Sequence, residues 1–263
     1  MEIKEIIIVG LGEVGQSWYK VASNIDANIL GIDINKTEKI DKNKIKGRSI
    51  MHICLPFLKN FEEIASSYMK KYKPDLVIIN TSCKVGITRK IHELTNVNIT
   101  HIPVRGIHPN IDKGIKTFVN AIGPINKESE KLTKNYLKKL KIEYDVFNNP
   151  EETEMAKLLD TSYYGWNILF SKEVYNLCKD YNLDYENVYK KFNETYNKGY
   201  IELGKKNVIR PVLIPPQIFN RKMGINNNKV NGHCVRTNLE ILKTMKNPRS
   251  IKFVDYAISL DEI

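Results

Sequence analysis

The sequence predicts an α/β protein in which a doubly wound parallel sheet, residues 1–147, is followed by an all-helical second domain, residues 148–263. Two observations support this class. Through the first half of the chain, short apolar runs alternate with segments that have helical spacing. After about residue 150 the helical spacing continues and the strand-like runs cease. A length of 263 residues is enough for two ordinary domains with cores of their own.

Five apolar runs in the first domain are expected to be parallel strands, because polar turns or helical patterns separate them. They cover residues 6–9, 27–32, 49–56, 76–80 and 99–104. Helices are expected at residues 57–72, 87–94 and 127–140, and two last strands at 118–122 and 143–147.

A long helix is expected to open the second domain. Asn148 and Asn149 supply a cap, Pro150 suits the first helical position, and two glutamates follow in the first turn. Apolar residues then keep helical spacing for about eight turns. A second helix is expected at residues 185–200, an irregular loop at 209–231 and a final helical segment from about Thr237.

The turn after the first strand carries the most specific motif. Residues 10–15 read Gly-Leu-Gly-Glu-Val-Gly between a buried strand and an expected helix. This is the context of a Rossmann-type dinucleotide-binding turn, in which the free N–H groups of the helix hold a pyrophosphate. The first glycine permits the turn, the second lets the phosphates approach, and the third lets the helix pack closely. The residues assigned to the cofactor here are Gly10, Gly12, Glu13, Val14 and Gly15.

An acid follows at the expected distance. The second strand ends at Asp33, 33 − 15 = 18 residues after the last glycine, close to the ~20 typical of the acid that binds a ribose 2′-hydroxyl. Because a carboxylate repels a 2′-phosphate, NAD is expected rather than NADP. Leu55 and Pro56 follow the third strand, and ligands bind outside the carboxyl ends of such strands, so both residues are expected to line the cofactor crevice.

The composition argues against several other classes of protein. The four cysteines form no C-x-x-C pair, so no metal site and no disulfide framework are expected. The net charge of +11 is spread along the whole chain, which favours anionic small molecules and not nucleic acid. No apolar run approaches the ~20 residues of a membrane span, and the first strand leaves no room for a signal peptide. A cytoplasmic protein is therefore expected, and the helical domain is expected to form a homodimer.

The order of motifs resembles a known superfamily. The glycine turn is followed by Ile-Cys-Leu-Pro at 53–56, Asn-Thr-Ser-Cys-Lys at 80–84, Glu-Met-Ala-Lys-Leu-Leu at 154–159 and Asn-Gly-His-Cys at 231–234. This series resembles the 6-phosphogluconate, nucleotide-sugar and 3-hydroxyacid dehydrogenases. It is most similar to the nucleotide-sugar 6-dehydrogenases related to UDP-glucose dehydrogenase, over nearly the whole chain. The C-terminal nucleotide-binding domain of that family is expected to be absent.

The resemblance implies roles in the second half of the chain. Lys157 would steady a carboxylate or a carbonyl oxygen, and Cys234 would be the thiol nucleophile of the family. Thr161 stands where the family has an asparagine, Asn238 where it has an aspartate, and His108 where it has an acid. Thr161 and Asn238 are accordingly assigned to substrate binding. These departures favour a two-electron over a four-electron oxidation.

A second, partial resemblance concerns the first domain. Ser-Cys-Lys at 82–84 and Gly-Ile-His-Pro at 106–109 resemble segments of prephenate and arogenate dehydrogenases, in which the serine and the histidine bind and activate the substrate hydroxyl. His108 would accept the hydroxyl proton and Ser82 would bind the hydroxyl or the nicotinamide ribose. Arg105 and Arg236 are candidate anchors for a substrate carboxylate or phosphate.

These residues also have purely structural interpretations. His108 and Ser82 would then be turn residues, Lys157 a solvated lysine and Cys234 a buried, inert thiol. The function predicted is NAD-dependent oxidation of an alcohol on a small anionic or sugar-like substrate, or its reverse, with His108 as general base. One alternative is a nucleotide-sugar 6-dehydrogenase relative that uses Cys234 covalently. The other is a non-catalytic NAD-binding protein.

Overall fold

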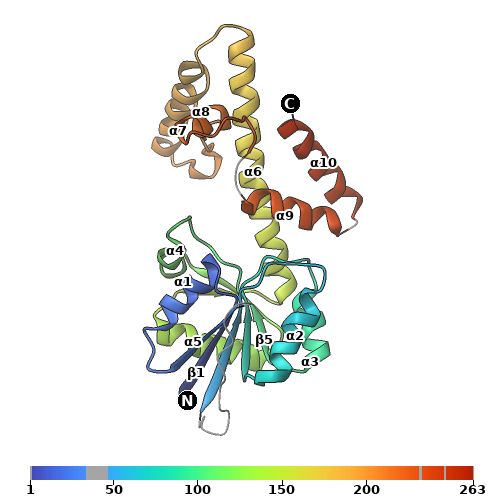
Figure 1. Cartoon of the computed structure of the whole chain (residues 1–263). Helices are drawn as coiled ribbons and strands as arrows, with labels where there is room; N and C mark the ends of the chain where they lie inside the picture. Colours follow the sequence, from blue (N-terminus) through green and yellow to red (C-terminus); the bar gives the residue numbers. More distant parts are fainter. Residues whose placement is uncertain (1, 34–46, 231–232, 246, 263) are drawn as a thin grey trace. The chain divides into compact units, whose positions relative to one another are not determined.

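The computed structural model describes residues 2–33, 47–230, 233–245 and 247–262. The chain forms two compact units, Met1–Lys157 and Leu158–Ile263 (Figure 1). The division falls inside helix α6 (Pro150–Asp180), whose first two turns belong to the first unit. Among the helices of the described ranges, none is long and apolar enough to cross a membrane.

The first unit is built on a seven-stranded sheet of order β2-β1-β3-β4-β5-β6-β7. The strands are β1 Ile3–Val9, β2 Asn28–Ile32, β3 Arg48–Ile53, β4 Leu76–Ile79, β5 Ile99–His101, β6 Asn120–Pro124 and β7 Tyr144–Val146. The first five are parallel, which confirms the predicted α/β class. However, β6 pairs antiparallel with β5, and β7 runs parallel to β6. The expectation of a wholly parallel sheet was therefore wrong for these two strands.

Helix α4 (Ile111–Thr117), which was not predicted, connects β5 to the reversed strand β6. Gly114 lets α4 pack on its preceding loop, since a Cβ there would lie 2.4 Å from the Cα of Gly106.

Helices cover both faces of the sheet, α1 (Glu13–Ala22) and α5 (Lys127–Leu140) on one side and α2 (Phe61–Tyr72) and α3 (Ile87–Thr95) on the other (Figure 1). Alternate residues of β1 consequently enter two different cores. Ile6 and Ile8 join one apolar cluster, whereas Ile7 and Val9 join the other. A strand buried on both faces needs apolar residues at every position, which is why these strands are continuous apolar runs in the sequence.

The second unit is all-helical in its described part, as predicted. After α6 the chain forms a π-helical segment η2 (Glu186–Lys191), α7 (Phe192–Glu202), a 3₁₀ turn η3 (Lys206–Val208), α8 (Pro216–Lys222), α9 (His233–Thr244) and α10 (Pro248–Glu262). Residues 209–231 were expected to be irregular, but they contain α8. Pro216 occupies its first position, where the missing N–H has no helical partner to lose. Helix α9 begins four residues before Thr237, which places Cys234 and Arg236 in its first turn.

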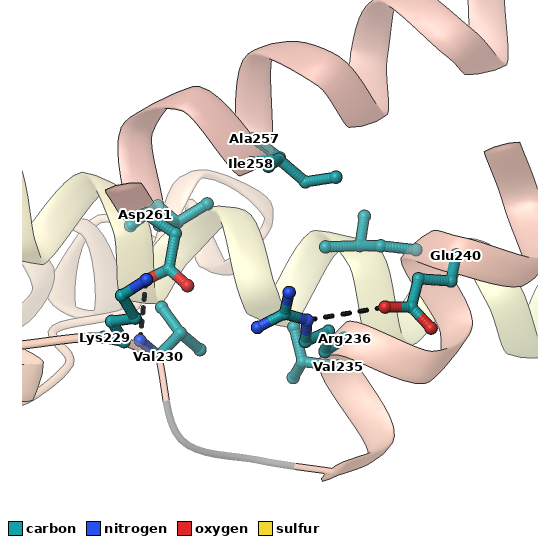
Figure 2. Close-up of a pocket in the computed structure, with 10 residues that line it drawn as sticks. Lys229, Val230, Val235, Arg236, Glu240, Ala257, Ile258 and Asp261 are labelled. Carbon is teal, nitrogen blue, oxygen red and sulfur yellow. Dashed lines mark hydrogen bonds and ion pairs between the residues drawn. The ribbon is translucent and has the colours of Figure 1, made fainter. Parts of the chain in front are cut away.

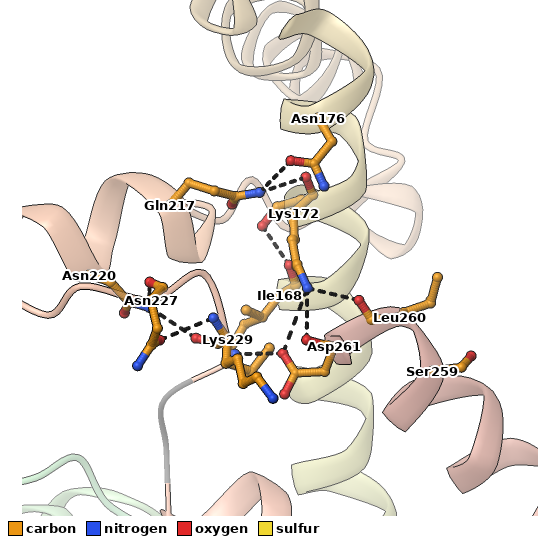
Figure 3. A network of polar contacts seen from close by, with 12 residues as sticks. Ile168, Lys172, Asn176, Gln217, Asn220, Asn227, Lys229, Ser259, Leu260 and Asp261 are labelled. Carbon is orange, nitrogen blue, oxygen red and sulfur yellow. Dashed lines mark hydrogen bonds and ion pairs between the residues drawn. The ribbon is translucent and has the colours of Figure 1, made fainter. Parts of the chain in front are cut away.

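A buried lysine joins α6 to α10 within the second unit (Figure 3). Lys172 is 1% exposed, and its Nζ donates hydrogen bonds to the carbonyl oxygens of Leu260 (2.9 Å) and Asp261 (3.0 Å). These carbonyls lie at the end of α10, where no helical N–H remains for them and where the helix dipole favours a cation. The Asp261 carboxylate in turn accepts the N–H of Val230 at 2.7 Å. Gln217 of α8 donates to the carbonyl of Lys172 at 3.2 Å.

Candidate functional site

The carboxyl ends of β1 and β3 form the point where the strand order reverses. The chain leaves β1 for β2 on one side and returns to β3 on the other. Parallel sheets bind their ligands outside such a switch point, because the flanking loops diverge there. The glycine turn after β1 and the segment 54–56 after β3 therefore border the candidate site.

The three glycines of the turn are required for different reasons. Gly10 has φ of 88°, and a Cβ there would lie 2.8 Å from the carbonyl oxygen of Cys54. A Cβ on Gly15 would lie 1.7 Å from the carbonyl oxygen of Gly10, so that helix α1 packs directly on the turn. Gly12 differs, because a Cβ there would have no atom within 4 Å. It is also the N-cap of α1 and supplies no side-chain cap. The space above Gly12 therefore adjoins helix N–H groups suited to an anion.

Asp33 lies beside this turn. Its Oδ2 accepts the backbone N–H of Leu11 at 2.8 Å, across the adjacent ends of β1 and β2. The carboxylate is thereby held at the β2 side of the glycine turn, where the sequence spacing predicted an acid.

Hydrogen bonds connect the end of β1 to the loop after β3, and that loop to the loop after β4. The N–H of Cys54 donates to the carbonyl of Val9 at 2.8 Å, and the hydroxyl of Thr81 donates to the carbonyl of Leu55 at 2.7 Å. Leu55 is half-buried and Pro56 is exposed. Ser82, the next residue after Thr81, is half-buried in the loop after β4. The structure thus brings three of the predicted loops to one edge of the sheet.

His108 reaches the glycine turn from the loop after β5. Its Nδ1 lies 2.8 Å from Oε2 of Glu13, the first residue of α1, and both side chains are exposed. Lys20 pairs with Asp112 at 2.5 Å, which ties α4 and the end of this loop to α1. Arg105 is exposed and donates to the carbonyl of Val119 at 3.0 Å. The candidate base therefore lies close to the turn assigned to the cofactor phosphates.

Lys157 approaches the same edge of the sheet from α6. Its half-buried Nζ donates to the carbonyl of Val104, just after β5, at 3.0 Å. Three residues earlier on α6, the completely buried Glu154 accepts the N–H groups of Gly86 (2.6 Å) and Thr88 (2.8 Å) at the start of α3. Glu154 belongs to the motif at 154–159, but no pattern in the sequence indicated this contact.

Two completely buried histidines beneath these loops were also missed. Nδ1 of His52 lies 2.8 Å from Oδ1 of Asn80, and its Nε2 lies 2.9 Å from the hydroxyl of Tyr136. Burial lowers the pKa of His52 to about 4, so the ring is neutral. The amide oxygen only accepts, so Nδ1 carries the proton and Nε2 accepts from Tyr136.

The second buried histidine, His101, links β5 to α6. Its Nε2 lies 3.2 Å from the carbonyl of Thr81 and its Nδ1 lies 2.8 Å from the hydroxyl of Thr153. Burial lowers the pKa of His101 to about 4. Since a carbonyl only accepts, Nε2 carries the proton, and the single proton of the Thr153 hydroxyl is shared between Nδ1 and the carbonyl of Pro150 at 2.9 Å. The signal for such residues is a polar side chain inside an otherwise apolar strand.

The candidates of the second unit gather where α9 packs on α6. Gly165 of α6 permits this packing, because a Cβ there would lie 2.6 Å from Val235. Cys234 is exposed in the first turn of α9, so the interpretation as a buried thiol was wrong. Thr161 and Asn238 are buried, and Nδ2 of Asn238 has no hydrogen-bond partner among the described atoms. The motif residues 231–232 lie outside the described ranges.

Arg236 borders a pocket between α6, α9 and α10 (Figure 2). Its Nε lies 3.4 Å from Oε1 of Glu240, one helical turn further along α9. Four charged residues and six apolar ones line the pocket: Lys229, Arg236, Glu240 and Asp261, with Leu169, Val230, Val235, Leu239, Ala257 and Ile258. The pocket thus combines an apolar lining with charges of both signs, and Arg236 is bound to a carboxylate.

These features define a Rossmann-type α/β unit followed by a helical unit. No protein-family model matches the chain. Among curated proteins, it is similar to the UDP-N-acetyl-D-mannosamine dehydrogenase of Methanococcus maripaludis strain S2, with 24% identity over 224 residues, 68% of this chain and 52% of the relative. The chain thus spans about half the length of the curated relatives it matches.

Solved structures show the same fold. A UDP-D-ManNAc dehydrogenase from Pyrococcus horikoshii has a TM-score of 0.73 at 18% identity, covering 98% of this chain and 68% of that one. A 3-hydroxyisobutyrate dehydrogenase from Mycobacterium tuberculosis has a TM-score of 0.68 at 13% identity, covering 98% of this chain and 94% of that one. The curated relatives, together with the shared fold, confirm the predicted resemblance to the nucleotide-sugar dehydrogenases.

Proposed function

We propose that this protein is a NAD-dependent dehydrogenase that oxidises an alcohol group of a sugar-like substrate, with nucleotide sugars as the first class to test. The observation that carries the proposal is the open space above Gly12, at an uncapped helix N-terminus, with the carboxylate of Asp33 beside the same turn. The similarity to UDP-N-acetyl-D-mannosamine dehydrogenases supports the substrate class.

The residues at the turn fit a dinucleotide. A Cβ on Gly12 would fill the space that the cofactor phosphates need, and the N–H groups of the first turn of α1 would bind them. Asp33 would accept a hydrogen bond from the adenosine ribose, which favours NAD over NADP. Glu13, Val14, Leu55 and Pro56 would line the rest of the site. When bound, NAD accepts a hydride from the substrate carbon.

Side chains of the protein would accept the proton of the substrate hydroxyl and stabilise the negative charge that develops on its oxygen. With Nδ1 of His108 donating to Glu13, Nε2 is the basic atom that would accept the substrate hydroxyl proton. Ser82 would bind that hydroxyl, and the ammonium of Lys157 would stabilise negative charge as it develops on the oxygen.

Substrate binding is assigned to four residues. Arg105 in the first unit and Arg236 in the second are each a candidate anchor for a carboxylate or phosphate through paired hydrogen bonds. Thr161 and Asn238, both buried, would supply polar contacts, and Nδ2 of Asn238, which has no hydrogen-bond partner among the described atoms, offers two N–H donors.

The experiment is a calorimetric titration with NAD and NADP, followed by a panel of UDP-sugars and 2- or 3-hydroxy acids monitored through NADH absorbance. NAD binding and turnover with a panel member support the proposal, whereas absence of binding to both coenzymes refutes it. Replacing His108 by alanine is expected to lower turnover ~10²-fold or more with NAD affinity retained. Near-normal turnover in that variant would exclude His108 as the base.

A second candidate uses Cys234 covalently, and its exposed position together with the named relatives supports it. The thiolate would add to an aldehyde product to give a thiohemiacetal, a second oxidation by NAD would give a thioester, and water would release the acid. This route produces two NADH per substrate, and Cys234→Ser would abolish acid formation but not NAD binding. One NADH per substrate supports the two-electron reaction, and NAD binding without turnover supports a non-catalytic protein.

We also infer a homodimer. Within the second unit, α7 has no buried residue, and large apolar side chains of α6 and α7 are exposed, among them Phe170 (59%), Leu177 (56%) and Phe192 (60%). Large exposed apolar side chains are typical of subunit interfaces. Light scattering after size-exclusion chromatography tests this, and a monomer at micromolar concentration would refute it.

A further inference from the structure

We infer that the buried carboxylate of Glu154 is a positioning group that holds Lys157 and the Ser82 loop in place at the carboxyl edge of the sheet. The roles of Lys157 and Ser82 in chemistry rest on the proposed function, but the positioning itself does not. Glu154 lies on α6, whereas its partners lie in and after the loop that follows β4. All of these residues belong to the first unit.

Both oxygens of Glu154 are engaged. Oε2 accepts the N–H of Gly86 at 2.6 Å and Oε1 accepts the N–H of Thr88 at 2.8 Å. The thiol of Cys83 lies 3.7 Å from Oε1, within the range of a weak sulfur hydrogen bond. Gly86 is the N-cap of α3 and has φ of 92°, so it brings no side chain to cap the helix. Glu154 therefore supplies, from another helix, the acceptor that an N-cap residue normally provides.

This contact fixes the orientation of the first turns of α6. Residues three apart share one face of a helix, so Lys157 projects from the same side as Glu154. Its Nζ reaches the carbonyl of Val104 at 3.0 Å. Thr153, adjacent to Glu154, binds the buried His101 of β5 at 2.8 Å. Rotation of α6 would break all three contacts, so the position of the Lys157 ammonium depends on the buried carboxylate.

The same carboxylate constrains Ser82. On one side of Ser82, the hydroxyl of Thr81 is bound to the carbonyl of Leu55 at 2.7 Å. On the other side, Cys83 and Gly86 contact Glu154. The loop is therefore anchored at both ends, and one of the anchors is the group that sets Lys157.

The charge of Glu154 suits this role. Burial raises the pKa of Glu154, whereas the N–H groups of Thr88 and Gly86 favour the ionised form. Each carboxylate oxygen faces a donor, so a glutamine would have to point its NH₂ group at a backbone N–H. Glu154→Gln therefore removes one acceptor with almost no change in volume. Glu151→Gln is the matched control, because Glu151 lies on the same helix and pairs with Arg89 near the surface.

The test measures the rate at which Lys157 is acetylated by an N-hydroxysuccinimide ester, by mass spectrometry on the full-length protein. In Glu154→Gln we expect Lys157 to react several-fold faster, while the half-exposed Lys134 of α5, paired with Glu130, serves as internal reference and stays unchanged. Glu151→Gln is expected to leave both rates unchanged. An unchanged Lys157 rate in Glu154→Gln would overturn the inference, because Glu154 would then not position Lys157. An equal rise at Lys134 would also overturn it, because the substitution would then loosen the protein in general.

Two further readouts complete the experiment. NAD affinity should stay within two-fold, because the hydrogen bonds of Glu154 go to the loop after β4 and the start of α3 and not to the glycine turn. Turnover should fall in kcat with KM little changed. If Glu154→Gln does not fold, Glu154→Asp keeps the charge but shortens the reach, and a smaller rise in the Lys157 rate is expected; no rise refutes positioning. A protein that binds no NAD yet shows the change in labelling would refute the proposed function and retain the role of Glu154.

Discussion

Substituting Gly12 by alanine should separate cofactor binding from folding. The backbone at Gly12 has φ of −66° and ψ of −170°, which alanine adopts without strain, and the added methyl meets no atom within 4 Å. The free energy of unfolding should therefore change by about 0.5 kcal/mol or less. In the complex, however, the methyl would occupy the space that the phosphates approach. Loss of one charge-assisted hydrogen bond costs ~1.5–3 kcal/mol, which corresponds to a 10- to 100-fold weaker NAD affinity.

The matched control is Gly15→Ala in the same turn. Its Cβ would lie 1.7 Å from the carbonyl oxygen of Gly10, so α1 must move away from the strand and the protein should lose several kcal/mol of stability. Thermal unfolding and NAD calorimetry on both variants give the comparison. If stably folded Gly12→Ala binds NAD with the affinity of the unmodified protein, the turn does not hold the phosphates and the cofactor assignment fails.

Three further outcomes follow from single contacts. Lys172→Met leaves two carbonyls at the end of α10 without their donor, so it should lower the free energy of unfolding by about 2–4 kcal/mol in urea titrations. Lys190→Met, which removes an exposed ion pair, should change that free energy little. Equal effects of the two substitutions would contradict a stabilising role for the contact between Lys172 and α10. Because the folded pKa values of His52 and His101 are about 4 against 6.5 unfolded, the unfolded state binds more protons in that interval. Stability should therefore fall as the pH drops from 6.5 towards 4, by about 3 kcal/mol per histidine, and a flat urea profile from pH 7 to 4.5 would disprove it. Asp33→Ala should weaken NAD binding and narrow its advantage over NADP in calorimetry; an unchanged ratio would remove Asp33 from cofactor selection.

The parts of the fold that were predicted are those set by local patterns. Strands buried on both faces appear as apolar runs, and α6 appears as a long segment of helical spacing, because each pattern reflects burial along one element. Helices α4 and α8 were missed because each has only seven residues and begins among residues typical of turns. The direction of β6 was missed because a buried apolar run has the same pattern in a parallel and in an antiparallel strand.

In the candidate site, too, the local motif was predictable and the contacts between distant residues were not. The glycine turn was predictable because the residues that build it are contiguous and their roles follow from the missing Cβ. The contact between His108 and Glu13 joins residues 95 positions apart (108 − 13 = 95), and that between Glu154 and Gly86 joins residues 68 apart. None of these residues, taken alone in the sequence, indicates which residue it contacts. Only the pairing of loops at one edge of the sheet makes them neighbours.

Helix α6 shows why a domain boundary placed from helical periodicity can differ from the boundary that the packing defines. Its helical pattern begins at Pro150, so the sequence favours a new domain from that helix onward. Glu154 binds the start of α3, Thr153 binds His101 of β5, and Lys157 binds the loop after β5, so the first two turns pack on the sheet unit. The side chains that secure these turns are polar and lie on one face, whereas apolar spacing reports only that the segment is helical. A helix that begins in one unit and continues in the next can therefore hold a candidate catalytic lysine against the sheet without any break in its pattern.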